Sequence, residues 1–202
     1  EHQPFTTPQA VAVALQVNLP AHLIAESGTG KSRFADAICN EWGWGCVTRI
    51  LATLLRPSGG TARIGGVDAV RDADGVRGQV GFLAHTPGLY DDLTARENLA
   101  FAATMLGRRD GQIDDVLARV GLTSVSDQRV RGFSAGMQRR LSLARLLLAS
   151  PRVFLLDEPY SNLDTDGTAL MNEVLRDAVA HGGAALVVLH ETAPAIGTLH
   201  RT

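Results

Sequence analysis

The sequence predicts an α/β protein built on a mainly parallel sheet, with a helical insertion. Apolar segments alternate with segments of helical periodicity, and the apolar segments lack the polar–apolar alternation of a half-exposed strand. Residues 86–144 contain helical patterns but no convincing strand. We therefore expect a core of residues 1–85 and 145–202, into which residues 86–144 are inserted as a helical subdomain. The 202 residues suffice for one buried core.

Composition excludes several classes of protein. Apolar residues make up 45% and charged residues 20% of the chain, which is ordinary for a globular protein. The net charge is -2 and the sequence has no long basic run, so direct nucleic-acid binding is not expected. The cysteines provide no disulfide framework and the histidines show no metal-ligand spacing. No run of about 18 apolar residues could span a membrane. One arginine cluster is interpreted as helix surface: Arg129, Arg131, Arg139, Arg140 and Arg145.

The elements of the first half follow from local signals. The predicted helices are residues 3–16, 32–42 and 49–55; the predicted strands are His22 to Ala25, a short strand and turn in residues 61–70, and residues 79–85. Glycines on both sides of Trp44 are expected to break the second helix, and Pro57 to end the third.

The second half has stronger helix signals. Thr94 and Glu97 form a capping-box pattern before an apolar stripe, and Gly121 is expected to close the helix of residues 114–122. The further predicted elements are helices at 137–150 and 168–183 and buried strands at 153–159 and 184–191.

A loop of small residues offers a phosphate site: Ser27, Gly28, Thr29, Gly30, Lys31 and Ser32. Backbone N–H groups in such a loop face a phosphate at the positive end of the following helix. Lys31 can reach the terminal phosphates and the Ser32 hydroxyl can ligate Mg²⁺. The first glycine of the full pattern is replaced by Ala25. The alternative is an ordinary Gly-rich turn.

Two further patterns carry chemistry. Asp157 and Glu158 end a buried strand, where the first carboxylate can hold Mg²⁺ and the second can act as general base on a water. Ser134 and Gly136 precede a long helix, which makes a capped, phosphate-friendly N-terminus. The alternatives are an acidic strand end and a simple helix cap.

Together these patterns resemble the nucleotide-binding subunit of an ABC transporter over residues 50–192. FSAGMQRR (133–140) resembles the family signature, LLDEP (155–159) its Walker B strand, SNLD (161–164) its D-loop and VLHE (188–191) its switch-histidine strand. The resemblance implies a three-layer P-loop NTPase core that binds ATP and Mg²⁺ and hydrolyses ATP. It also implies a homodimer in the ATP-bound state and an integral membrane partner that holds the chain at the cytoplasmic face of the membrane.

The same resemblance assigns roles to single residues. Ser134 and Gly136 would bind the γ-phosphate of ATP held by the opposite subunit, and Asp164 would contact across the dimer. His190 would contact the γ-phosphate, with Glu158 as the base.

Some positions depart from the family pattern. Ala135 and Met137 replace a glycine and a glutamine of the signature, and His85 stands at the Q-loop glutamine position. An imidazole there can still contact Mg²⁺-bound water or the transport partner. His85 and the text around it are similar to ATPases of the cytochrome c maturation haem exporter, although drug, lipid and antibiotic exporters share much of this sequence.

Residues 1–48 fit the family least. They lack the expected two-strand lead-in, and the helix expected soon after Lys31 begins only near Arg49. One interpretation is a chimera whose first third resembles an AAA-type or other P-loop ATPase, with residues 46–50 as a strand; the other is a local insertion.

Three functions compete. The first is an exporter ATPase, and the second is a nucleotide-binding module without turnover. The third is an ABC ATPase acting on DNA or ribosomes, which usually has two cassettes or long insertions, and neither is present.

Overall fold

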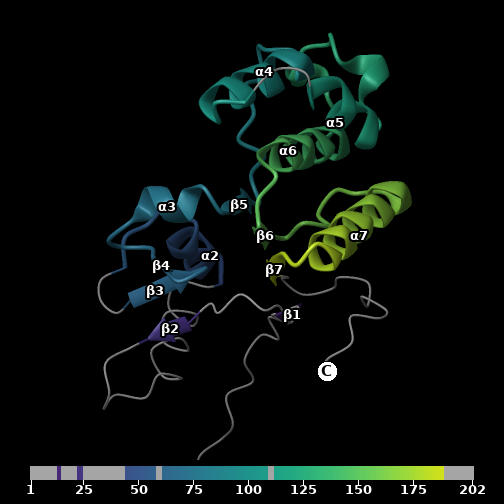
Figure 1. Cartoon of the computed structure of the whole chain (residues 1–202). Coiled ribbons are helices and arrows are strands. Elements are labelled where there is room, and N and C mark those ends of the chain that lie inside the picture. Colours follow the sequence, from purple (N-terminus) through teal and green to yellow (C-terminus); the bar gives the residue numbers. More distant parts are fainter. Residues whose placement is uncertain (1–12, 15–21, 25–43, 58–60, 109–111, 189–202) are drawn as a thin grey trace, which may run out of the picture.

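The computed structural model describes residues 13–14, 22–24, 44–57, 61–108 and 112–188 (Figure 1). In these residues, strands and helices alternate along the chain through the core. A group of helices separates, in the sequence, two strands that are neighbours in the sheet. The predicted α/β class is therefore visible in the order of the elements.

The central sheet is mainly parallel. Its strands are β1 (Val13–Ala14), β7 (Ala184–Val188), β6 (Val153–Asp157) and β5 (Val80–Leu83), in that order across the sheet. β6 runs parallel to both of its neighbours, with Leu83 paired with Leu156 and Asp157 paired with Val188. β1 runs antiparallel at the edge of β7. The ends of β5 and β6 that carry His85 and Glu158 therefore lie side by side.

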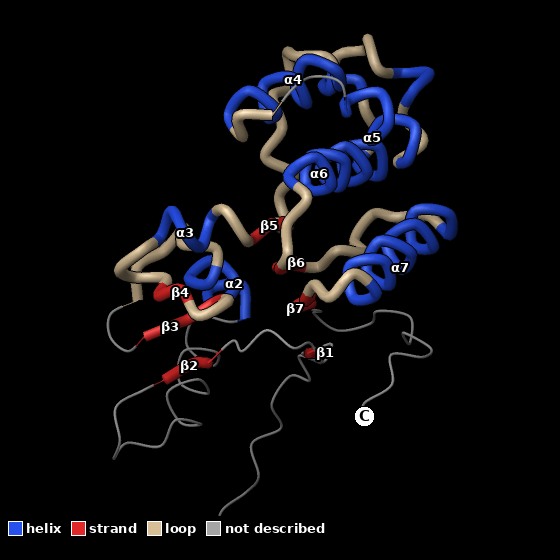
Figure 2. Tube along the Cα trace, viewed as in Figure 1, coloured by secondary structure: helices blue, strands red, loops and turns tan. Residues whose placement is uncertain are grey.

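Helices lie on both sides of this sheet (Figures 1 and 2). On one side are α2 (Trp44–Leu51), α3 (Ala73–Arg77) and a small antiparallel sheet of β2 (His22–Ile24), β3 (Thr61–Ile64) and β4 (Val67–Asp68). On the other side are α6 (Ala135–Ala149) and α7 (Thr165–Ala180). At Gly81 a Cβ would lie 2.4 Å from Leu146 Cδ1, so only glycine lets α6 pack this closely on β5.

Side chains along β6 alternate between two cores. Phe154 and Leu156 belong to the larger core, with residues of α6 and α7, whereas Val153 and Leu155 belong to a smaller core with residues of α2 and α3. All four side chains are buried. This burial on both faces explains why the strand is apolar up to Leu156, because none of these four positions faces solvent, where a polar side chain would be favourable.

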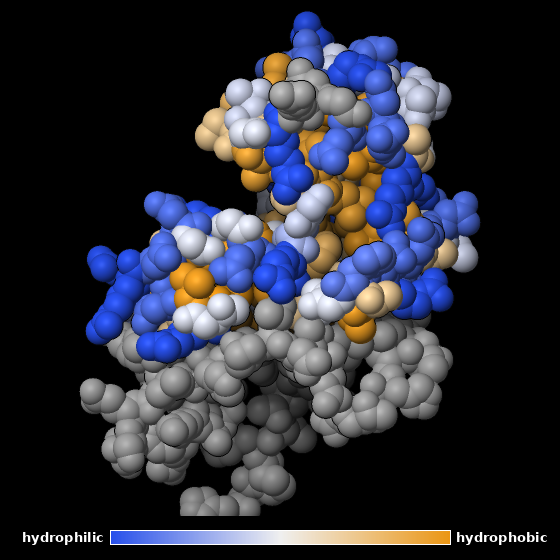
Figure 3. Space-filling view, viewed as in Figure 1, coloured by the Kyte–Doolittle hydropathy of each residue, from blue (hydrophilic) through white to orange (hydrophobic). Residues whose placement is uncertain are grey.

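The helical insertion packs around the first part of α6. It comprises α4 (Ala95–Met105), α5 (Ile113–Arg119) and the short 3-10 turns η2 (Thr123–Val125) and η3 (Val130–Gly132). The predicted capping box is confirmed: the Glu97 N–H donates to Thr94 Oγ1, and the Thr94 N–H donates to Glu97 Oε2. Apolar side chains gather at the junction between the helical insertion and the core on the face shown in Figure 3.

The N-terminal expectations were less accurate. Val13–Ala14, predicted to be helical, forms the strand β1, whereas the strand predicted from His22 to Ala25 is confirmed as β2. Residues 1–48 therefore contain two short strands, although a two-strand lead-in was expected to be missing. The helix expected from Arg49 begins at Trp44 and ends at Leu51, so it includes Gly45, and residues 46–50 are not a strand. The helix predicted at residues 32–42, with its break, lies outside the described residues. Amphipathic packing of α2 on the sheet outweighs the low helix propensity of one glycine.

None of the helices in the described residues combines the length and the apolar composition needed to cross a membrane.

Candidate active site

The carboxyl ends of β5 and β6 bring two predicted catalytic residues together. The strands are parallel neighbours, so the segments that follow them leave the sheet at the same edge, where ligands of open α/β sheets bind. His85 Nδ1 lies 2.8 Å from Glu158 Oε2. The two side chains are 61% and 25% exposed, so the pair is accessible to a ligand from solvent.

Glu158 is held through its side chain and its backbone. The Ser161 hydroxyl donates to Glu158 Oε2 over 3.0 Å, and the Glu158 N–H donates to the Val188 carbonyl over 2.9 Å. Its φ of 48° lies in the left-handed region, which residues other than glycine rarely adopt. Such strained positions persist where surrounding contacts over-determine them, and they concentrate at functional sites. The carboxylate is thereby presented in a fixed place.

Asp157 is the last residue of β6 and is half-buried beside this pair. Within the described part of the chain, no group of three or more His, Cys, Asp or Glu residues could hold a metal ion. Mg²⁺, however, is commonly bound by one or two carboxylates together with substrate phosphates. A single strand-end carboxylate therefore fits a magnesium ion that arrives with a nucleotide.

Ser134 and Gly136 lie at the start of α6, as predicted. Ser134 is the N-cap residue, and its hydroxyl accepts a hydrogen bond of 3.2 Å from the Met137 N–H. At Gly136 a Cβ would lie 2.9 Å from the Asn162 carbonyl oxygen. The start of the signature helix is thus in close contact with the loop of residues 161–164, which follows β6. Glycine at position 136 makes this approach possible.

Asp164 has a structural role that the sequence analysis did not predict. It is the N-cap residue of α7, and its Oδ1 accepts hydrogen bonds from the Gly167 N–H at 2.7 Å and from Arg140 Nη2 at 2.6 Å. The hydrogen bond from Gly167, followed by that from Arg140, holds the pKa of the Asp164 carboxyl below its ordinary value. The carboxylate is therefore ionised and anchors the loop to α6.

The interpretation of the arginine cluster as helix surface is wrong for Arg139. Its side chain is 2% exposed and donates to backbone carbonyls at the ends of β5 and β6. The helical periodicity contained the signal, because Arg139 falls on the same stripe as buried Ser142, Leu143 and Leu146. A basic residue on a buried stripe needs hydrogen-bond acceptors or opposite charges, because charged side chains are rarely buried without them.

Seven predicted site residues lie outside the described residues: Ser27, Gly28, Thr29, Gly30, Lys31, Ser32 and His190. Their roles stay predictions.

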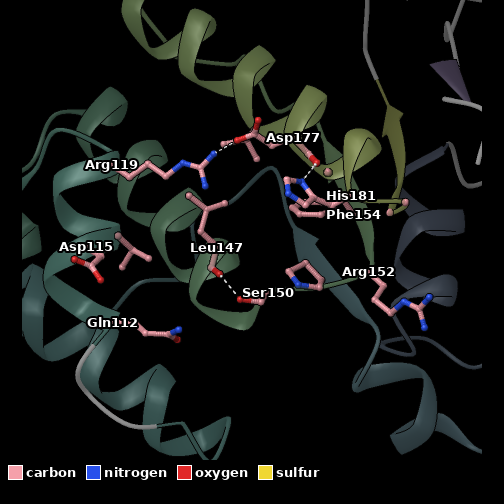
Figure 4. A pocket seen from close by; sticks show the side chains of 15 residues that line it. Gln112, Asp115, Arg119, Leu147, Ser150, Arg152, Phe154, Asp177 and His181 are labelled. Atoms are coloured by element: carbon pink, nitrogen blue, oxygen red, sulfur yellow. Dashed lines mark hydrogen bonds and ion pairs between the residues drawn. The ribbon is translucent and has the colours of Figure 1, made fainter.

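A cavity of about 520 Å³ lies at the opposite, amino end of β6 (Figure 4). Phe154 of the strand and Arg152, which precedes it, line the cavity, and Arg119 of α5 forms an ion pair with Asp177 of α7 across its rim. Because parallel sheets bind ligands at their carboxyl edge, the edge with His85 and Glu158 is the better candidate for the active site.

The comparison with known families agrees with this geometry. The model of a family described as "ABC transporter" matches residues 11–161. The chain belongs to the ABC transporter family. The match begins before the Gly-rich loop and therefore includes residues 27–32. It does not test whether residues 1–48 have a separate origin, so the chimera stays a hypothesis.

Several relatives of known name are similar to this chain. The cytochrome c biogenesis ATP-binding export protein CcmA of Methylococcus capsulatus is 40% identical over 144 residues, which cover 70% of each chain. CcmA of Xanthomonas axonopodis pv. citri is 45% identical over 144 residues, 70% of this chain and 66% of the relative. The daunorubicin resistance ATP-binding protein DrrA3 of Streptomyces coeruleorubidus is 38% identical over 147 residues, covering 71% and 46%.

Two solved structures share the fold. The ATP-binding subunit of an ABC transporter superposes with a TM-score of 0.67 at 24% identity, covering 74% of this chain and 64% of the other. An ATP-binding cassette solved as a dimer with ADP and phosphate superposes with a TM-score of 0.65 at 22% identity, covering 74% and 70%. The predicted P-loop NTPase fold class is confirmed, as is the class of protein, an ATP-binding ABC-type ATPase subunit.

Proposed function

We propose that this chain is the ATP-hydrolysing motor subunit of an exporter that serves cytochrome c biogenesis, with haem as the exported group. The observation that carries the proposal is the close contact of His85 with Glu158 beside Asp157, at the edge of the sheet where a nucleotide would bind. The names of the CcmA relatives, which are ATP-binding export proteins for cytochrome c biogenesis, support the choice of transport process.

In this proposal Glu158 is the general base. Its carboxylate accepts a proton from the water that attacks the γ-phosphate, and the hydrogen bond from Ser161 and the contact with His85 orient it for that transfer. Asp157 and Ser32 would hold Mg²⁺, which neutralises charge on the phosphates when it is bound. Residues 27–31 would cradle the phosphates through backbone N–H groups and the Lys31 ammonium. His190 would contact the γ-phosphate.

Two copies would form the working dimer. Ser134 and Gly136 begin a helix whose N-terminal N–H groups suit a phosphate held by the opposite subunit. Asp164 is bonded to Arg140 of the same helix. The nucleotide-bound dimer would close around two ATP molecules, and hydrolysis would allow it to reopen.

A membrane subunit is the proposed partner, and it would hold the chain at the cytoplasmic face of the membrane. The helical insertion offers a surface for it: Tyr90, Phe101, Met105 and Leu106 are exposed apolar side chains that line a cavity of about 330 Å³. Tyr90 and Phe101 pack edge to face with ring centroids 5.1 Å apart. Apolar patches of this kind commonly mark protein interfaces.

Glu158→Gln tests the proposal. We expect ATP hydrolysis to fall by about 10²- to 10⁴-fold, the usual contribution of a general base, while ATP binding persists and an ATP-bound dimer accumulates. The measurements are phosphate release and size-exclusion chromatography with Mg²⁺-ATP. Glu173→Gln, which removes an exposed glutamate on α7, is the matched control and should behave as the parent. Parent-like hydrolysis by Glu158→Gln would show the mechanism to be wrong.

A further inference from the structure

Arg139 reaches from α6 to the ends of two strands of the sheet. Its Nη1 donates to the carbonyls of Ala84 and His85 at 2.5 and 3.4 Å. Its Nη2 donates to the carbonyls of Asp157 and Glu158 at 2.8 and 2.5 Å, and its Nε to that of Pro159 at 3.3 Å. One guanidinium therefore contacts five backbone oxygens from two separate segments.

This arrangement suits arginine and no other side chain. A guanidinium presents five N–H donors in a rigid plane, whereas the lysine ammonium has three donors on a flexible stem. A buried cation is unfavourable unless its donors are satisfied. Burial lowers the pKa of the Arg139 guanidinium, and the neighbouring charges of Asp157 and Glu158 act in the opposite direction. The carbonyls and carboxylates together keep the charge in place.

Three of the five carbonyls belong to residues of the candidate active site, namely His85, Asp157 and Glu158. His85 and Glu158, whose side chains meet at 2.8 Å, both have their backbone oxygens bound by Arg139. Arg139 itself lies in the second turn of the helix that begins at Ser134. One side chain thereby connects the start of that helix to the backbone of both residues.

We propose that Arg139 is a positioning residue for ATP hydrolysis, which holds His85 and Glu158 in the catalytic arrangement relative to the start of α6. In the proposed dimer, Ser134 would bind the nucleotide held by the opposite subunit, whereas Glu158 would act on the nucleotide held by its own subunit. Arg139 therefore links the two nucleotide sites within one chain. The inference rests on the proposed function.

Arg139→Lys is the first test, because it keeps the charge but loses the planar fork. We expect kcat for ATP to fall by about 10- to 100-fold, as displacements near 1 Å do in active sites, while KM stays close to that of the parent. A residue with a structural role alone would lower stability without this division between kcat and KM.

Arg145→Lys is the matched control. Arg145 lies on the same helix and donates to the carbonyls of Gly88 and Pro87 at 2.6 and 2.9 Å, but it does not bind His85 or Glu158. Its replacement should lower the unfolding temperature by a similar amount and leave kcat near that of the parent. Equal kcat values for the two lysine variants would overturn the inference.

Two measurements keep the test independent of turnover. In hydrogen exchange, Arg139→Lys should accelerate amide exchange in residues 84–87 and 157–162 together; unchanged exchange in both segments would overturn the inference. In the parent protein, the Arg139 side-chain N–H signals should be resolved and slowly exchanging in NMR spectra, and a freely rotating guanidinium would overturn it even if the variant does not fold. If the parent releases no phosphate, the proposed function fails, and these two measurements still decide the role of Arg139.

Discussion

The imidazole of His85 and the carboxylate of Glu158 are in direct contact, with 2.8 Å between Nδ1 and Oε2. The two residues are far apart in the sequence, and the parallel pairing of β5 with β6 brings them together. A histidine at the Q-loop position is thus in direct contact with the residue proposed as the general base. This contact makes the orientation of Glu158 dependent on position 85.

His85→Ala should lower kcat for ATP hydrolysis by about tenfold, because the carboxylate of Glu158 loses the imidazole contact that orients it. His85→Gln should recover part of this loss, since an amide N–H can donate to Glu158. His181→Ala, at an exposed histidine of the α7 C-terminus, is the control. The measurement is steady-state phosphate release, and parent-like turnover by His85→Ala would count against an orienting role.

Gly136→Ala should disturb the loop of residues 161–164, because its Cβ would lie 2.9 Å from the Asn162 carbonyl oxygen. We expect a loss of stability of about 1–3 kcal/mol and a larger loss of hydrolysis. Gly132→Ala is the matched control, since nothing lies within 4 Å of the Cβ that it would add. Urea unfolding and phosphate release measure the two effects, and equal stability of the two variants would refute the close contact.

Asp164→Asn should lower stability in a pH-dependent way. Hydrogen bonds from Gly167 and Arg140 lower the Asp164 pKa in the folded protein, so the carboxylate stabilises the fold fully above its ordinary pKa of 3.8. This contribution is lost as the pH falls through the lower, folded-state pKa. The unfolding temperature of the variant should therefore lie below that of the parent at neutral pH. The difference should narrow in acid, because protonated Asp164 loses its charge and asparagine, which is also neutral, can still cap the helix.

Asp166→Asn provides the comparison for Asp164. Asp166 lies in the first turn of the same helix and makes neither of these two hydrogen bonds. Its variant should show a smaller difference from the parent. A constant difference for Asp164→Asn across the pH range would contradict the assigned cause.

Lys31→Ala should weaken ATP binding by about 10- to 100-fold, the usual effect of losing a hydrogen bond to a charged group. Lys31 is the only lysine of the chain, so an amine-reactive ATP analogue should modify it selectively and ATP should protect it. Calorimetry and mass spectrometry measure the two effects. Equal affinity of parent and variant would mean that the loop of residues 27–32 does not bind the nucleotide.

Elements with strong local signals were predicted well. The capping box of Thr94 and Glu97 starts α4 as predicted, and the continuous apolar segment that ends at Asp157 is the buried strand β6. The errors lie where local signals are weak. Val13–Ala14 is a strand because it pairs with β7, and Trp44 begins a helix in spite of Gly45 because α2 packs on the sheet. Tertiary contacts override propensity in such short segments.

The sequence by itself determined the family, the fold class and the residues that can carry the chemistry, because the order of catalytic residue types and the apolar periodicity are properties of the linear chain. Only the tertiary structure decided that His85 contacts Glu158, that Asp164 caps α7 while bonding Arg140, and that Arg139 is buried beneath the active site. These relationships depend on distances between segments that are remote in the chain. Parallel strand pairing and the packing of α6 set those distances, and no local pattern specifies them.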